Sequence, residues 1–539
     1  MNALDWIIVI LYLAGMIGLS VYLSKGQKTV EDYYLGGNKI KWWQISLSTM
    51  ATQCSTNSLL GAPAFVAFAA GGGLIWLQYE LAVPLAMIVA MIFLFPFYRS
   101  ANVVSIYEYL EMRFGPGSRT VLSLLFQFLR AFSTGVTVYG ISLVIHKCMG
   151  LPLGVSIIVL AVITIVYDSI GGIKAVIASD VIQMVVLLFG VLLIGYYALD
   201  LVGGFDEMIR HADKSRLLTI DFGHHGLGDG KTFAFWPMLI GGLFLYVSYY
   251  GCDQTQVQRE LSSTGIDDSR RSLFMNGILR FPLVLAYCFT GVAIGSYAMS
   301  HPEFMDLLPL KADGSREFNL AAPTFVLEYL PHGVIGIIMV ALFAAAMSSL
   351  DSTINSLSAM TEKDIFERYL SKGRTEAAKL WWSKGATVFW GTICTIFAFF
   401  VSDISDSIIE SINKIGSLIN GPILATFLLA ILTKRATGEG TVTGIIFGFG
   451  INLLLWKFAP GISWLWWNVI GCGATFFIGY GVSLFFPKPS EEKIRGLTFS
   501  GEAAVMAIGE KKWRKYYFLL AGYAVFILAV LVFINQLFT

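Results

Sequence analysis

The sequence carries little charge for its length. Of its 539 residues, 14% are charged and 56% are hydrophobic, whereas a soluble protein has charge on about 25% of its residues. The mean hydropathy is +0.69, and apolar runs of about 20 residues, each long enough to cross a bilayer, recur along the chain. These features exclude a soluble globular protein and predict an all-α polytopic membrane protein.

Motifs of enzymes and of metal or nucleotide sites are also missing. The six cysteines lack a CxxC pair and the six histidines lack ligand spacing, so neither a disulfide framework nor a zinc site is indicated. The sequence contains no GxxxxGK[ST] motif for ATP-driven transport and no nucleophile–base pair for an enzyme. The polar stretch 487–515 is too short for an appended signalling domain. We expect no enzyme activity and no nucleic-acid partner.

The apolar runs predict fourteen membrane spans, and the first is too long to be a cleaved signal peptide. The spans are predicted at residues 4–24, 41–70, 74–98, 118–147, 153–172, 177–202, 234–257, 272–299, 322–360, 381–402, 406–433, 438–458, 463–486 and 516–537. Of the 37 Lys and Arg residues, 26 fall on the side that contains residues 25–40. Because basic loops face the cytoplasm, we expect both termini of this multi-pass cell (plasma or inner) membrane protein to be extracytoplasmic.

Six spans each contain a charged residue. A charge near mid-membrane costs about 3 kcal/mol on insertion scales and by default marks a functional site. An internal ion pair or a snorkelling side chain is the alternative for any one of them. Six charges in six spans favour a shared polar cavity. They are Glu80, Arg130, Asp180, Arg280, Asp351 and Lys414.

Two spans contain polar interruptions that predict broken helices. In one, a Ser/Thr/Gln/Asn cluster within residues 48–63 is followed by Pro63, and in the other Gly251 lies among the polar residues of 246–259. Unwound backbone at such depth is tolerated only where it lines a protein cavity, and its freed carbonyls can bind a cation. Close packing of helices through small residues is the alternative.

A polar face also interrupts the apolar run of residues 341–360, ALFAAAMSSLDSTINSLSAM. Ser348, Asp351 with Ser352, and Asn355 with Ser356 follow helical spacing, so they share one face. Serine hydroxyls can bond to carbonyls one turn back, but an ionised Asp351 cannot. The face therefore predicts a neighbouring cation or a water-filled cavity, and its oxygen ligands suit a hard cation such as sodium.

Six segments together resemble the sodium/solute symporter family, whose members carry sugars, proline, vitamins or sialic acids. The segments are KTVEDYYLGGN (28–38), SIYEYLEMRF (105–114), GGIKAVIASDVIQ (171–183), QTQVQR (254–259), FAAAMSSLDSTINSLSAMTEKDIF (343–366) and INGPILATFLLAILTKRA (419–436). The resemblance implies the leucine-transporter-like fold of two inverted five-helix repeats. It divides the chain into a leading helix and cytoplasmic loop (1–40), a first repeat (41–202), an extracellular loop (203–233), a second repeat (234–436) and three terminal helices (437–539).

The resemblance also implies sodium ligands. The family's common sodium site maps to the backbone carbonyls of Ala51, Cys54 and Ala345 and to the hydroxyls of Ser348 and Ser349. A second sodium site, present in some members, maps to Asp180, Asp351 and Ser352 together with Ser348. Asp351 stands where two-sodium members have a hydroxyl, so its carboxylate would strengthen that site, bind a proton instead or change the stoichiometry.

The implied substrate site combines features of two subgroups. A match to sodium–galactose carriers places Glu80, Arg280 and Asn413 at sugar-binding positions. Sialic acid carriers use a Ser/Thr-rich first helix and an arginine, and Arg130 lies one turn from the aligned position of that arginine. A cationic Arg130 would suit a carboxylate. The candidate substrate-binding residues are Ser55, Ser58, Glu80, Arg130, Ser133, Tyr246, Tyr249 (the matched inner gate), Arg280 and Asn413.

The sequence thus predicts a sodium-coupled symporter that works by alternating access, with sodium as the co-transported ion and the lipid bilayer as its environment. We rank a sugar or sugar acid (hexose or sialic acid type) first as the solute, and a monocarboxylate, vitamin-like anion or amino acid second. The alternatives from other classes are proton-coupled transport and a sodium-independent passive transporter or channel. We expect a monomer or a weak dimer.

Overall fold

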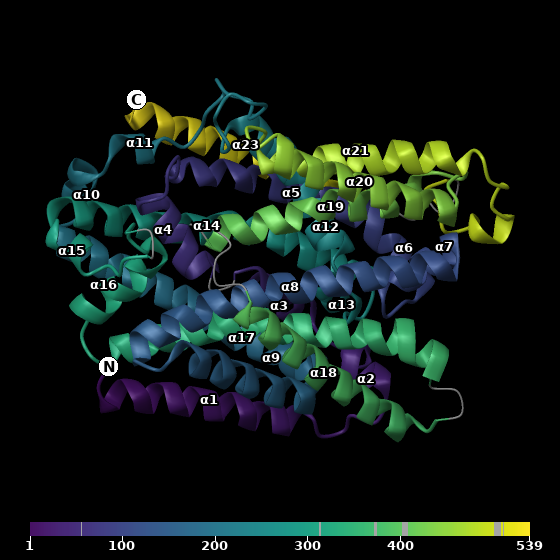
Figure 1. Cartoon of the computed structure of the whole chain (residues 1–539), viewed down its shortest axis with the longest axis horizontal. Helices are drawn as coiled ribbons and strands as arrows, with labels where there is room; N and C mark the ends of the chain where they lie inside the picture. The colour runs from purple at the N-terminus through teal and green to yellow at the C-terminus, as the bar shows by residue number, and fades with distance from the viewer. Residues whose placement is uncertain are drawn as a thin grey trace.

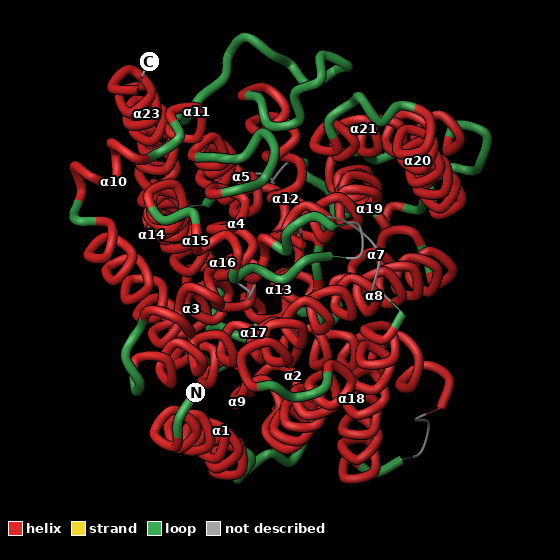
Figure 2. Tube along the Cα trace, turned by 60° about the vertical axis from the view of Figure 1, so that its left-hand side comes forward, coloured by secondary structure: helices red, strands yellow, loops and turns green. Residues whose placement is uncertain are grey.

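The computed structural model describes residues 1–54, 57–311, 314–370, 374–400, 408–500, 508–509 and 511–538. The regular structure of these residues is helical, with loops between the helices (Figure 2). The long helices run roughly along the longest axis of the molecule, and both chain ends lie at the same end of that axis (Figure 1). The basic loops predict that both termini lie on the same side of the membrane. The side that they face stays a prediction.

Ten helices among the described residues are long and apolar enough to span a membrane, so the prediction of a polytopic helical membrane protein is confirmed. Nine of them coincide with, include or lie within α1 (Ala3–Leu23), α8 (Pro116–Met149), α9 (Leu153–Val202), α14 (Ile266–Ser300), α17 (Val334–Met360), α19 (Ile408–Leu432), α20 (Gly438–Phe458), α21 (Trp464–Ser483) and α23 (Lys511–Phe538). The tenth is the helical stretch Leu74–Ala101, which contains η3 (Leu74–Leu81), α5 (Ala82–Val89), η4 (Ala90–Leu94) and α6 (Phe95–Ala101).

The other helices of the described part are shorter or less apolar. The α-helices are α2 (Val30–Leu35), α3 (Trp42–Gln53), α4 (Ala62–Ala67), α7 (Ile106–Phe114), α10 (Phe205–His211), α11 (Lys214–Leu217), α12 (Gly242–Cys252), α13 (Gln254–Leu261), α15 (Glu303–Asp306), α16 (Ala321–Tyr329) and α18 (Glu376–Phe399). Shorter 3₁₀ or π segments are η1 (Gly36–Asn38), η2 (Asn57–Gly61), η5 (Pro237–Gly241), η6 (Phe318–Leu320), η7 (Thr361–Leu370) and η8 (Glu491–Lys493). The α18 helix corresponds to the span predicted at 381–402.

Both predicted helix breaks are present. The α3 helix ends at Gln53, Cys54 leaves the helical conformation (φ −83°, ψ 61°), and a π turn at Asn57–Gly61 leads into α4. The α12 helix ends at Cys252, after which Asp253 is extended (φ −91°, ψ 117°). The Asp253 side chain caps α13 by accepting a hydrogen bond from the Thr255 backbone N–H at 2.7 Å. Each break frees backbone groups that a continuous helix would pair internally.

One predicted span begins at the wrong residue. The span 322–360 is wrong at its start, because α16 ends at Tyr329, Gly333 turns the chain (φ +90°), and the spanning helix begins at Val334. Pro331 lacks a backbone donor and Gly333 adopts a left-handed φ, which explains the interruption. The predicted spans 153–172 and 177–202 correspond to the two helical parts of α9, which meet at the non-helical residue Gly172 (φ +58°, ψ −163°).

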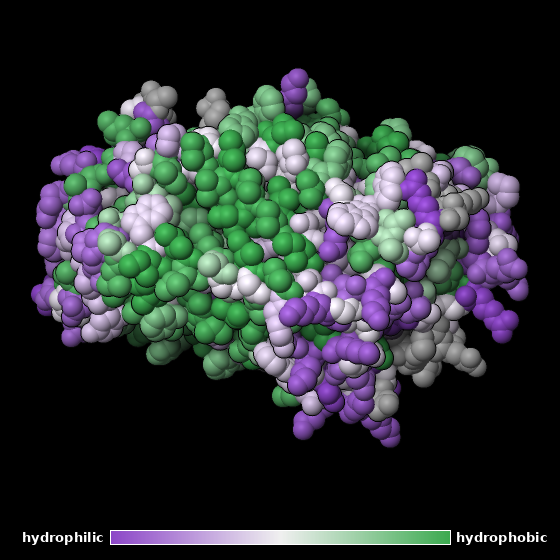
Figure 3. Space-filling view, turned by 90° about the horizontal axis from the view of Figure 1, so that it is seen from below, coloured by the Kyte–Doolittle hydropathy of each residue, from purple (hydrophilic) through white to green (hydrophobic). Residues whose placement is uncertain are grey.

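The outer surface of the molecule suits a bilayer. Apolar side chains form a broad band between the polar ends of the long axis (Figure 3). Large apolar side chains are exposed on α1, α20 and α23, for example Leu11 (67%), Phe447 (55%) and Phe518 (77%). Because lipid tails accept such side chains without cost, this surface is the expected lipid contact of a spanning bundle.

The α17 helix lies in the interior of the bundle. All of its residues from Ile338 to Met360 are buried. It packs against α1, α3, α8, α9, α13 and α18. Since protein surrounds this helix, its polar face must find partners in neighbouring helices and not in lipid or water.

We predict that Gly444→Ala loosens the contact between α20 and α21. A Cβ at Gly444 would lie 2.5 Å from the Thr475 carbonyl oxygen and 2.9 Å from the Gly479 Cα. Overpacking of this kind costs about 1–3 kcal/mol, which thermal unfolding in detergent would report as a lower Tm. The matched control is Gly450→Ala on the same helix, where a Cβ meets nothing within 4 Å. Equal Tm values for the two variants would contradict this close approach of the backbones.

Candidate functional site

The polar face of α17 contacts three other helices along its length. Its hydroxyl, carboxylate and amide groups bond to α3, α9 and α13. Ser349 is the most exposed of these polar residues, at 9%, and Ser348 and Asp351 are at 0%. An unsatisfied polar group in such surroundings costs several kcal/mol, so these contacts are a condition for burying the helix.

Ser348 and Ser349 meet the end of α3. The Ser348 hydroxyl donates to the Ala51 carbonyl at 3.1 Å and lies 3.2 Å from the Ala345 carbonyl. The Ser349 hydroxyl lies 3.2 Å from the Thr52 carbonyl and 3.4 Å from the Ala345 carbonyl. The Ala51 and Thr52 carbonyls belong to the last turn of α3, where intrahelical donors run out. The structure therefore gathers five oxygens of the kind that a hard cation prefers.

Four of the five predicted ligands of the first sodium site lie in this oxygen cluster, and they remain a prediction as sodium ligands. Cys54, the fifth, lies where α3 ends, and its thiol accepts from Arg280 Nη1 at 2.9 Å. The Thr52 carbonyl was missed by sequence reasoning. Its only signal was its place beside the predicted break.

A guanidinium group lies between the residues predicted for the second sodium site. Arg259 Nη2 lies 3.2 Å from Asp180 Oδ2 and also donates to the Ser352 hydroxyl. Arg259 Nε donates to the Ser48 hydroxyl at 2.8 Å, and that hydroxyl donates to Asp180 Oδ2 at 2.5 Å. The side chains of Arg259 and Asp180 are 1% and 0% exposed. The sequence indicated Arg259 only as part of the QTQVQR segment.

Asp351, also predicted for the second sodium site, is turned toward different partners. One of its carboxylate oxygens accepts a hydrogen bond from the Tyr167 hydroxyl of α9, and the other contacts the backbone N–H and the hydroxyl of Ser352. All of these partners are neutral donors. The sequence predicted a cation or a water-filled cavity beside this face. The hydrogen-bond partners that the structure gives Asp351 are instead Tyr167 of α9 and Ser352.

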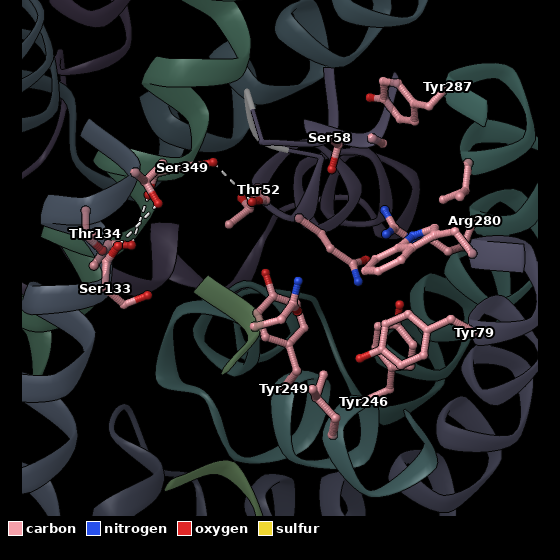
Figure 4. A pocket seen from close by; sticks show the side chains of 18 of the residues that line it. Thr52, Ser58, Tyr79, Ser133, Thr134, Tyr246, Tyr249, Arg280, Tyr287 and Ser349 are labelled. Atoms are coloured by element: carbon pink, nitrogen blue, oxygen red, sulfur yellow. Dashed lines mark hydrogen bonds between the residues drawn. The ribbon is translucent and has the colours of Figure 1, made fainter. Parts of the chain in front are cut away.

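A cavity of about 150 Å³ adjoins the oxygen cluster. Polar and aromatic side chains surround it, with Arg280, Tyr79 and Tyr287 on one side and Ser133, Thr134 and Ser349 on the other (Figure 4). Its lining consists of Thr52, Gln53, Ser58, Ala62, Trp76, Tyr79, Arg130, Ser133, Thr134, Thr137, Leu245, Tyr246, Tyr249, Arg280, Val284, Tyr287, Ser349, Thr353 and Asn413. Thr52 and Ser349 belong to both the cavity and the oxygen cluster, so the two sites share a wall.

Most of the predicted substrate-binding residues come together in this cavity. Seven of the nine line it: Ser58, Arg130, Ser133, Tyr246, Tyr249, Arg280 and Asn413. Glu80 is fully buried behind the lining, and Ser55 lies outside the described residues. Residues that sequence reasoning missed include Thr134 and Thr137, whose spacing from Ser133 on α8 was the available signal.

Each arginine of the cavity is paired with a buried carboxylate. Arg280 Nε lies 3.1 Å from Glu80 Oε2, and the Tyr246 hydroxyl donates to Glu80 Oε1 at 3.2 Å. Arg130 Nη1 lies 3.3 Å from Asp253 Oδ2. The internal ion pairs considered as the alternative from sequence are thus present, and they lie at the edge of the shared cavity. The arginines line the cavity while the local charge stays balanced.

Comparison with known proteins places these observations in a family context. The family model described as "SSF: Sodium:solute symporter family" matches residues 33–448. The sodium/sialic acid symporter SiaT of Proteus mirabilis is 30% identical over 475 residues, which cover 87% of this chain and 92% of that one. The human sodium-coupled monocarboxylate transporter 1 is 29% identical over 451 residues, covering 82% of this chain and 72% of that one.

Two solved structures show the fold. A substrate-bound, outward-open Na+-coupled sialic acid symporter superimposes with a TM-score of 0.80 at 27% identity, covering 91% of this chain and 99% of that chain. Mhp1, a nucleobase-cation-symport-1 family transporter in a closed conformation, superimposes with a TM-score of 0.53 at 14% identity, covering 87% of this chain and 98% of that chain. The fold is therefore leucine-transporter-like, as these neighbours share it.

The pair of Glu80 and Arg280 gives a prediction for stability. Arg280→Met leaves the Glu80 carboxylate buried without its cation, and breaking a buried pair costs about 3–5 kcal/mol. Adding Glu80→Gln removes the second charge and should recover most of that loss. Thermal unfolding of the two single variants and the double variant forms a double-mutant cycle. If the double variant loses as much stability as the sum of the single losses, the two groups do not act as a pair.

Proposed function

The chain belongs to the sodium:solute symporter family and is a multi-pass, sodium-coupled solute symporter, not an enzyme; from that premise we propose that it imports a small polar organic solute, a sugar or sugar acid, by alternating access. The observation that carries this proposal is the wall shared by the oxygen cluster and the cavity. Thr52 and Ser349 line the cavity, and the Ser349 hydroxyl lies 3.2 Å from the Thr52 carbonyl in the oxygen cluster.

Sodium binds in this proposal to the carbonyls of Ala51, Cys54 and Ala345 and the hydroxyls of Ser348 and Ser349. The ion joins the broken end of α3 to α17 and so stabilises one arrangement of these helices over others. Because α3 and α17 also form part of the cavity wall, sodium and solute favour the same state. A membrane potential adds about 2.3 kcal/mol per transported charge per 100 mV.

The moving parts in this proposal are two inverted five-helix repeats, residues 41–202 and 234–436. Each repeat begins with a broken helix, α3/α4 in the first and α12/α13 in the second. Broken helices in inverted repeats are where transporters of this kind bind substrate and ion. Tyr249 lines the cavity near the second break, and its hydroxyl accepts from Gln256 at 2.6 Å. It is the proposed inner gate through which solute and sodium leave.

The lining of the cavity supports a hydroxylated solute with a carboxylate. Hydroxyl groups of Ser58, Ser133 and Thr134 and the tyrosines of the wall can exchange hydrogen bonds with sugar hydroxyls. The guanidinium of Arg130 suits a carboxylate because charge-assisted bonds to it are strong. The relative from Proteus mirabilis, named a sodium/sialic acid symporter, supports the same class.

A monocarboxylate is the second candidate. The cavity of about 150 Å³ is small, since pockets for drug-sized ligands start at roughly 300 Å³. A short carboxylic acid would fit beside Arg130 without filling the polar remainder of the cavity. The human relative is named a sodium-coupled monocarboxylate transporter.

Uptake into proteoliposomes tests the proposed function. We expect electrogenic, sodium-dependent accumulation of a solute from a panel of hexoses, sialic acids, monocarboxylates and amino acids. Ser348→Ala combined with Ser349→Ala should abolish the accumulation, because both hydroxyl ligands of the ion are lost while the helix remains apolar and compact. Ser356→Ala, a buried serine two turns along the same face, is the control. Unchanged accumulation in the double variant, or uptake that persists when choline replaces sodium, would refute the proposal.

The charge preference of the cavity can be tested at Asp253. Asp253→Asn keeps a capping oxygen for α13 but removes the carboxylate that lies 3.3 Å from Arg130. In this variant we expect the ratio of the inhibitory concentration of sugar acids to that of neutral sugars to fall about fivefold below the wild-type ratio. This change corresponds to about 1 kcal/mol. Asp253→Ala removes the cap as well and should lower stability by about 1 kcal/mol. If Asp253→Asn leaves the ratio between acidic and neutral sugars unchanged, Arg130 does not bind a carboxylate.

A further inference from the structure

The guanidinium of Arg259 makes the contacts that a second sodium ion would need. It donates to the carboxylate of Asp180 on α9 and the hydroxyl of Ser352 on α17, two of the residues predicted for that site. A sodium ion at this position would compete with the guanidinium for Asp180 Oδ2 and the Ser352 hydroxyl. A guanidinium and an ion cannot occupy that space together.

The remaining donors of Arg259 fix the guanidinium in place. Nε donates to the Ser48 hydroxyl of α3 at 2.8 Å, and Nη1 donates to the Thr255 carbonyl of α13. The planar guanidinium is permanently charged and has a rigid set of donors, and here these reach α3, α9 and α17 at once. Arg259 is 1% exposed, so water does not compete for its partners.

Asp351 is directed at partners other than Arg259. Its two oxygens are directed at the Tyr167 hydroxyl and at the backbone N–H and hydroxyl of Ser352. Among the described residues, no group of three or more His, Cys, Asp or Glu side chains could hold a metal ion. The cation paired with Asp180 in the structure is Arg259, at 3.2 Å.

We infer that Arg259 is a tethered cation that takes the place of a second sodium ion between Asp180 and Ser352, so that this transporter carries one sodium ion. The inference rests on the proposed sodium site at Ser348 and Ser349, which supplies that one ion. Arg259 acts by position, since it holds α13 against three helices without contacting the solute cavity. The guanidinium fills the second position and stays with the protein through the transport cycle. A bound sodium ion would instead be released with the solute.

Equilibrium binding of radiolabelled sodium to the purified full chain in nanodiscs tests the inference without a solute. We expect one sodium ion per wild-type chain, and two ions would overturn the inference. Binding of no ion would instead overturn the proposed sodium site, so the two failures are distinguishable. The wild-type count decides the question even if variants fail to fold.

Two substitutions of Arg259 sharpen the test. R259Q removes the charge, leaves Asp180 without its cation and should raise the count from one ion to two. R259K keeps a cation on the same helix and should stay at one ion. A second ion in R259Q that survives Ser348→Ala with Ser349→Ala would locate it away from the first site. A folded R259Q that still binds one ion would show that the guanidinium does not exclude sodium.

Discussion

The buried polar face of α17 is the constraint on which the rest of the site depends. In an apolar bundle each of its hydroxyl, carboxylate and amide groups needs a partner, because an unpaired one costs several kcal/mol. The neighbours meet this need with structural irregularities. The α3 helix stops early and presents carbonyls, α9 presents Tyr167, and the break at Asp253 lets α13 bring Arg259 inward.

In the proposed mechanism these irregularities couple the ion to the solute. Thr52 and Ser349 belong to the oxygen cluster and to the cavity wall, so a cation bound to Ser349 at the end of α3 also constrains the shape of the cavity. Such coupling is thermodynamic, since each ligand binds more tightly to the arrangement that the other favours. The ion pairs of Arg280 with Glu80 and of Arg130 with Asp253 keep the cavity close to neutral while leaving donors at its surface.

Much of this arrangement could be predicted from the sequence where a local pattern had a local cause. Pro63 with its polar cluster predicted the break after α3, and helical spacing put Ser348, Asp351 and Ser352 on one face. The resemblance to a family then placed seven substrate-site candidates that the fold brings into one cavity. Pro331 and Gly333 also signal the interruption before α17. The prediction of one continuous span over 322–360 gave more weight to the apolar residues on either side.

Contacts between distant segments could not be predicted in the same way. Arg259 reads as a basic residue at the end of a span, and only the packing of α13 against α17 and α9 turns it into the partner of Asp180. Glu80 looked like a ligand for sugar, whereas the fold buries it behind Arg280. Tyr167, the partner of Asp351, lies 184 residues away along the chain. Charge and spacing do not specify which of several buried groups will meet.

Hydrogen–deuterium exchange with and without sodium tests the central claim most directly. If sodium binds between the end of α3 and the middle of α17, it should slow exchange of amides near residues 50–54 and 345–352, while α20 and α21 stay unchanged. N-methyl-D-glucamine and potassium at the same ionic strength should have no such effect. Equal exchange in sodium and potassium at these two segments, in protein that transports its solute, would contradict a sodium site at this position.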